Sequence, residues 1–185
     1  MTPFRPLNTS RGCFSETGHL RKVVMCPPTH FEIVEPTNYM QWIYWSDGLP
    51  RPNPDVMTQQ HNRLVEILRE EGVEVELLLP VPALPFQHAT RDVGVVIGDT
   101  VVLGNMKERT RRLEAEVTEP VLEGYGLRVV HPNRGFVEGG DVVVENGNLW
   151  VGVGRRTDEW GAEFLHDAFG QDREVIPLRF DPHYT

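Results

Sequence analysis

The sequence predicts an α/β fold built from about three copies of one strand–hairpin–helix–strand unit. Segments 92–103 and 141–151 each contain an aspartate, an apolar strand, a Gly-Asp or Asn-Gly turn and a second apolar strand, a pattern typical of a β-hairpin. Each hairpin is followed by a helical pattern, at about 107–123 and 158–169, and then by another strand. Repeats of roughly fifty residues are typical of solenoids, propellers and arrays.

The three units are expected over approximately 12–80, 90–131 and 137–180. In the first unit, a strand over 19–26 ends at two prolines, a helix over about 56–71 carries an apolar stripe, and Gly72 is placed as its C-terminal cap. The remaining predicted strands cover 73–77, 127–130 and 174–178.

A proline-rich segment, 29–55, enlarges the first unit and shows no periodicity. An irregular segment of this length is usually a functional loop or lid. The aromatic residues Tyr39, Trp42, Tyr44 and Trp45 either pack this loop onto the core or stack over a cationic ligand. The sequence leaves both interpretations open.

Composition places the chain among globular proteins and excludes several partners. The 185 residues are 39% hydrophobic and 24% charged, as expected for one domain, 1–185. The net charge of −9 argues against nucleic acid and anionic membranes as partners. Two cysteines, Cys13 and Cys26, do not form a disulfide framework, so a cytoplasmic setting is expected. No metal-ligand spacing is present, and neither a metal nor another cofactor is expected.

The stretch 137–141, Val-Glu-Gly-Gly-Asp, is the strongest chemical signal. Glu138 and Asp141 flank two glycines, which allow a ligand to approach the backbone closely. A carboxylate held there can accept hydrogen bonds from a cation or transfer protons. Asp92 stands at the start of the preceding hairpin unit. Two similar strands therefore predict two carboxylates at a shared place.

An ordered set of motifs resembles the guanidino-group-modifying enzymes, which include arginine deiminases, dimethylarginine dimethylaminohydrolases and amidinotransferases. The resemblance implies the pentein fold, a five-bladed α/β propeller, of which this chain holds about three blades. It extends over nearly the whole chain and lies in these segments: Ser15–Val23, Gln60-His61, Thr90-Arg91-Asp92, Arg111–Glu114, Glu138–Asp141 and Arg155-Arg156-Thr157.

The resemblance also implies roles for individual residues. In this family a cysteine attacks the guanidinium carbon and forms an amidino intermediate, a histidine transfers protons, and carboxylates bind the guanidinium nitrogens. Glu138 corresponds to the catalytic acid and Asp92 to a guanidinium-binding residue. Arg111 and Arg156 correspond to residues that hold the substrate's α-carboxylate, with Arg112 or Arg155 as the alternatives. Further candidates are Asp141, Arg91 and Asn38.

Two departures from the family pattern affect these expectations. Ala89 replaces a phenylalanine, which suggests a more open pocket and a different substrate. The catalytic histidine motif is expected just after Thr185, and His183, Cys13 and Cys26 do not match the positions of the histidine and the nucleophile. We therefore expect an N-terminal part of the enzyme that is inactive alone.

For the complete protein, the expected activity is hydrolysis of a guanidino C–N bond of arginine or methylated arginine, because Glu138 favours a hydrolase. The alternatives are an amidinotransferase, a non-catalytic arginine-binding pentein fragment, or an unrelated α/β domain whose motif matches are coincidental. The expected ligand is a small guanidino compound. Unpaired strand edges between blades make a homodimer possible.

Overall fold

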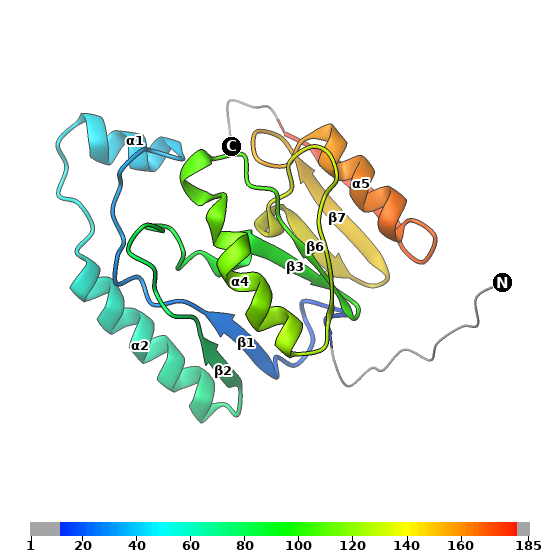
Figure 1. The fold of residues 1–185 in the computed structure, drawn as a ribbon, viewed down its shortest axis with the longest axis horizontal. Coiled ribbons are helices and arrows are strands. Elements are labelled where there is room, and N and C mark those ends of the chain that lie inside the picture. The colour runs from blue at the N-terminus through cyan, green and yellow to red at the C-terminus, as the bar shows by residue number, and fades with distance from the viewer. Residues whose placement is uncertain (1–11, 181–185) are drawn as a thin grey trace.

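Three small β-sheets form the centre of the fold, each with a helix beside it (Figure 1). The computed structural model describes residues 12–180. The first sheet pairs β1 (Lys22–Met25) in parallel with β2 (Glu74–Leu77). The second contains β3 (Gly94–Ile97), β4 (Thr100–Leu103) and β5 (Arg128–Val130), and the third contains β6 (Val142–Glu145), β7 (Asn148–Val153) and β8 (Glu174–Arg179).

The second and third sheets repeat one topology. In each sheet the first two strands form an antiparallel hairpin, and the third strand pairs in parallel with the second after a helical crossover. Asn146 and Gly147 both have positive φ angles, 51° and 79°, as a tight hairpin turn requires. Both predicted hairpins are therefore present, although Asp92 and Asp141 lie in short helical turns just before the strands rather than within them.

Local capping explains where the long helices begin and end. The Asn53 side chain accepts a 2.8 Å hydrogen bond from the Asp55 N–H at the start of α2 (Pro54–Glu70). Asp158 caps α5 (Glu159–Phe169) in the same way, through the Gly161 N–H at 2.8 Å. The helix predicted from 107 begins later: a 3₁₀ turn, η1 (Arg109–Arg111), precedes α4 (Leu113–Gly124).

The proline-rich segment contains a helix that the sequence analysis did not predict. Asn38 caps α1 (Tyr39–Ser46), and its side chain accepts a 2.9 Å hydrogen bond from the Gln41 N–H. No residue of α1 is buried; Tyr39 and Trp45 are 73% and 53% exposed. The interpretation that these aromatic residues pack onto the core is therefore wrong for the exposed members of the group. An eight-residue helix with apolar residues on all sides has no clear period.

The main core lies between the second and third sheets and under α5. It is built almost entirely from β-branched and leucine side chains, and alternate residues of β6 and β7 point into it. On β4 both faces are buried, because Val101 and Leu103 belong to a second buried cluster with Val93 and Ala115. Its buried members are Val95, Ile97, Val102, Val137, Val142, Val144, Leu149, Val151, Val153, Ala162 and Leu165. Between residues 12 and 180, no helix combines the length and apolar character needed to cross a bilayer.

Two helical turns meet at the edge of this core. α3 (Thr90–Val93) leads into β3, and η2 (Gly139–Asp141) leads into β6. The two turns pack against each other, although almost fifty residues separate them in the sequence. This packing brings the two predicted acidic segments together.

Candidate functional site

The two glycines of the Val-Glu-Gly-Gly-Asp stretch allow η2 to approach α3. A Cβ atom at Gly139 would collide with the backbone oxygens of Gly94 and Arg91. A Cβ atom at Gly140 would instead meet the Oδ1 atom of the Asp92 side chain. The close approach at these two glycines is thus made by the neighbouring polypeptide, whereas the sequence analysis expected a ligand there. It fixes Glu138 beside Asp92.

Glu138 is a buried carboxylate with one unsatisfied oxygen. The residue is 1% exposed, and its N–H donates to Thr157 Oγ1 at 3.0 Å. Its Oε2 accepts from Arg156 Nη1 at 3.3 Å, whereas Oε1 has no hydrogen-bond partner among residues 12–180. Burial raises the Glu138 pKa to about 7, against the opposing charges of Arg156 and Arg111. The group therefore changes its charge near neutral pH and keeps a buried acceptor atom that residues 12–180 leave unused.

Arg111 is the buried cation of the site. Its Nε donates to both oxygens of Glu114, and Nη2 donates to Glu114 Oε2 at 2.9 Å. Its Nη1 donates to Asp92 Oδ2 at 2.7 Å and lies 3.9 Å from Glu138 Oε2. Burial lowers the Arg111 pKa, but the hydrogen bonds to Glu114 and Asp92 outweigh this and raise it overall.

Arg156 completes a group that we call the carboxylate–arginine cluster: Asp92, Glu114, Glu138, Arg111 and Arg156. Its Nη1 lies 3.9 Å from Asp92 Oδ2, in addition to its contact with Glu138. Of the alternatives, Arg112 points outward to the carbonyls of Met106 and Lys107, and Arg155 pairs with Glu108. The structure thus brings all four main predicted site residues together.

The other three predicted residues make their hydrogen bonds with residues outside the cluster. Asp141 Oδ2 accepts a 3.1 Å hydrogen bond from the Thr157 N–H, and burial raises the Asp141 pKa. Arg91 donates to Glu16 and to the Val142 carbonyl, which holds the Ser-Glu-Thr motif at 15–17 against the third sheet. Asn38 caps α1, as described above. Only Asp141 borders the cluster.

The sequence analysis did not select three contributors to the site. Glu114 is completely buried and holds Arg111; its spacing of three residues along a helical turn was the available signal. Thr157 connects Glu138 with Asp141. His88 has a buried Nδ1 without a hydrogen-bond partner among the described residues, and its pKa is lowered by burial and then by the Arg111 charge. Thr157 belongs to the Arg155-Arg156-Thr157 motif of the resemblance, whereas no motif marks His88.

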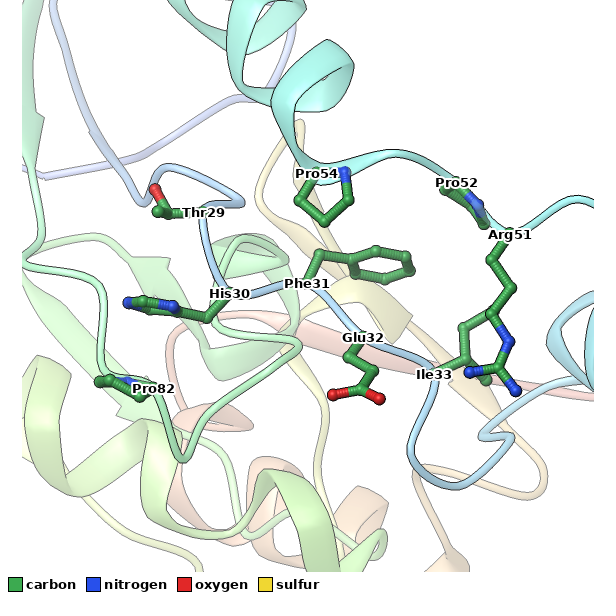
Figure 2. A pocket seen from close by; sticks show the side chains of 9 residues that line it. All are labelled: Thr29, His30, Phe31, Glu32, Ile33, Arg51, Pro52, Pro54 and Pro82. Atoms are coloured by element: carbon green, nitrogen blue, oxygen red, sulfur yellow. The ribbon is translucent and has the colours of Figure 1, made fainter.

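An open cleft of about 460 Å³ lies apart from the cluster, between the 29–33 segment and the start of α2. In Figure 2, Glu32 and Arg51 project to one side of this cleft, and His30 points towards Pro82. Phe31 lines the cleft and also meets the His88 ring edge-on, with ring centroids 5.1 Å apart. None of the five cluster residues lines this cleft.

Neither cysteine has an activated thiol. Cys26 is 1% exposed, and burial, followed by the nearby Glu114 charge, raises its pKa to about 11. Burial also raises the Cys13 pKa. Among residues 12–180, no group of three or more histidine, cysteine, aspartate or glutamate side chains is arranged to hold a metal ion.

Comparison with known proteins identifies the family. The family model described as arginine deiminase matches residues 77–181. An uncharacterized protein of Bacillus subtilis, YkgA, is 35% identical over 89% of this chain and 54% of its own length. Because the family model covers more than half of the chain, the chain belongs to the arginine deiminase family within the pentein superfamily.

Solved structures show the same fold. A mutant of AgrE in a binary complex with L-arginine matches with a TM-score of 0.74 and 30% identity, over 86% of this chain and 23% of that one. AgrE of Nostoc is a bifunctional arginine dihydrolase/ornithine cyclodeaminase. A dimethylarginine dimethylaminohydrolase structure matches with a TM-score of 0.72 over 88% of this chain and 61% of that one. At 19% identity it shows the mixed α/β fold alone. The chain spans about half or less of the length of the curated relatives AgrE and YkgA.

Substitution of the two glycines tests how η2 is positioned. We expect Gly139→Ala to reduce the free energy of unfolding by about 3 kcal/mol, because the added methyl group collides with backbone atoms that cannot move away. Gly140→Ala should cost less than Gly139→Ala, since it meets only the end of the Asp92 side chain, although moving that carboxylate disturbs its hydrogen bond from Arg111. Urea denaturation of both variants measures the difference. Equal losses would contradict the packing described here.

The ionisation of Glu138 should make stability depend on pH. Its pKa is raised from 4.5 to about 7 in the folded protein, so ionisation is harder in the folded than in the unfolded chain, and folding is destabilised as pH rises through this range. One pKa unit corresponds to about 1.4 kcal/mol. The free energy of unfolding of Glu138→Gln, relative to that of the wild type, should therefore rise by about 3 kcal/mol between pH 4 and pH 8.

Denaturation curves at several pH values measure this gain. The control is Glu163→Gln, which removes a carboxylate that is 51% exposed on α5; its difference from the wild type should stay nearly constant with pH. A constant difference for Glu138→Gln as well would show that Glu138 ionises normally.

Proposed function

We propose that this chain binds the guanidinium group of an arginine-like ligand between Glu138 and Asp92. The observation that carries the proposal is the buried Glu138 carboxylate, whose Oε1 has no partner among the described residues, while Arg156 Nη1 lies within 3.9 Å of both Glu138 Oε2 and Asp92 Oδ2. A guanidinium is planar, permanently charged and rich in donors, so paired carboxylates match it closely. The L-arginine complex of the 30% identical AgrE supports this ligand class.

The proposal includes an architecture and an enzyme class. Residues 1–185 form one incomplete pentein domain. It holds three of the five blades, which are the units 12–80, 90–131 and 137–180. With the rest of such a domain, the chain forms a hydrolase that cleaves a guanidino C–N bond of arginine or methylated arginine through a cysteine-bound amidino intermediate. Glu138 is the carboxylate beside the reacting carbon, and Asp92 orients the guanidinium nitrogens.

The two arginines take different parts in this proposal. Arg111 positions Asp92, because the nitrogens of its guanidinium already donate to Glu114, Asp92 and the Ala89 carbonyl. Arg156 remains the better candidate to meet a ligand carboxylate, since its side chain is 25% exposed.

A second candidate function is arginine binding without turnover. The observation in its favour is that burial raises the pKa of both thiols, so neither Cys13 nor Cys26 is a ready nucleophile. The covalent step is therefore proposed only for a protein that supplies another cysteine and a histidine.

Calorimetric titration with L-arginine and dimethylarginine tests the proposed site. We expect Glu138→Gln and Asp92→Asn to weaken binding by at least about tenfold, because each removes one charge of a partly or fully buried ionic contact. Glu163→Gln serves as the matched control and should bind like the wild type. Citrulline release is assayed in parallel and should be absent for this chain. Failure of the wild type to bind either compound would refute the proposal.

Binding should also become tighter as pH rises. Only ionised Glu138 attracts a guanidinium, and with a pKa of about 7 its ionised fraction increases strongly between pH 6 and pH 8. We expect the L-arginine affinity to rise by roughly tenfold over this interval. Glu138→Gln should remove the pH dependence; a wild-type affinity that is flat or falls would argue against Glu138 as the contact.

A further inference from the structure

The Arg156 guanidinium already contacts the two protein carboxylates between which we propose that a ligand binds. Arg156 lies in the turn between β7 and α5, and its Nη1 is 3.3 Å from Glu138 Oε2 and 3.9 Å from Asp92 Oδ2. Within residues 12–180, its side chain makes no other hydrogen bond or ion pair. Among the described residues, the hydrogen bonds and ion pairs of this side chain are therefore made only with the two carboxylates of the proposed ligand site.

Arg111, the other cation of the cluster, is attached quite differently. Its side chain is 5% exposed and donates several hydrogen bonds to the completely buried Glu114. Moving Arg111 would leave a buried carboxylate without its partner, which is strongly unfavourable. Arg156 can turn towards solvent at much smaller cost, since it is partly exposed already. The cluster thus contains one fixed and one replaceable guanidinium.

We propose that Arg156 determines the ligand specificity of the site as a built-in guanidinium that a ligand must replace. The inference rests on the proposed function, because it assumes that ligands bind between Glu138 and Asp92. Arg156 and a ligand guanidinium carry the same charge and the same donors, so exchanging one for the other gains little by itself. A simple guanidinium ion is therefore bound weakly, and a ligand must bring further contacts, such as an anionic group for the displaced Arg156.

A small space, large enough for about one water molecule, lies beside Arg156. It measures about 20 Å³, and the Asp141 carboxylate there offers another counter-charge to a side chain that has left Glu138. The residues that line it are Asp141, Gly152, Gly154, Arg155, Arg156 and Phe180.

Titration with 1-propylguanidinium, which has no carboxylate, tests the proposal. If Arg156 occupies the carboxylates for most of the time, its removal raises the apparent affinity by the reciprocal of the free fraction, about fivefold for a site that is 20% free. We expect Arg156→Ala and Arg156→Gln to bind 1-propylguanidinium at least about fivefold more tightly. The affinity for L-arginine should increase less in these variants, because the contact between the ligand's carboxylate and Arg156 is lost. Arg63→Ala, which removes a 60% exposed arginine side chain on α2, should leave both affinities unchanged.

The outcomes separate this inference from the proposed function. If wild-type L-arginine binding is lost in Glu138→Gln but Arg156→Ala binds 1-propylguanidinium no more tightly, the inference is overturned and the proposed function stands. If the wild type binds no guanidino compound, both fail.

A measurement on the intact chain avoids any folding defect of the variants. Nitrogen and carbon NMR signals of the arginine guanidinium groups are followed during titration with L-arginine. The Arg156 signal should move on saturation, while the Arg111 signal keeps its position. An unchanged Arg156 signal at saturation would overturn the inference.

Discussion

The buried Arg111 guanidinium is the interaction on which the rest of the site depends. A charged side chain that is only 5% exposed is tolerated only when oppositely charged groups form well-placed hydrogen bonds with it. Glu114 and Asp92 supply these hydrogen bonds within 3.2 Å. These hydrogen bonds connect the start of α4 to α3. Because η2 packs on α3 through two glycines, the position of Glu138 also follows from Arg111. One ionic contact thus fixes three segments that are distant in the sequence.

Much of the fold follows from local patterns in the sequence. The apolar runs on either side of Asn146-Gly147 are enough to predict a hairpin, since the turn needs two positive φ angles and the strands need one buried face. Asn53 and Asp158 mark helix starts for the same local reason. By contrast, α1 was not predicted, because the exposed apolar residues of Tyr39–Ser46 show no helical periodicity.

Four of the five members of the carboxylate–arginine cluster were selected from the sequence, but their contacts were not. Glu138, Asp92, Arg111 and Arg156 were selected from motifs, and the structure places them together. Their pairing could not be read from spacing, because 46 residues separate Asp92 from Glu138 and the pairing depends on how two turns pack. Glu114 shows the difference most clearly. Its contact with Arg111 is local, yet its burial, which gives that contact its importance, comes from tertiary structure.

The balance of charges explains how the cluster tolerates a buried Glu138. Burial favours the neutral acid, and two guanidinium groups oppose it, so the Glu138 pKa settles near 7 instead of rising further. Arg156 supplies the closer of these two charges, at 3.3 Å against 3.9 Å for Arg111. A ligand guanidinium that replaced Arg156 would bring the same charge to the same carboxylate. The Glu138 carboxylate would then keep a neighbouring cation throughout the exchange, and the free-energy cost of ligand entry would stay low. Discrimination between different guanidino ligands would therefore depend on the rest of each ligand.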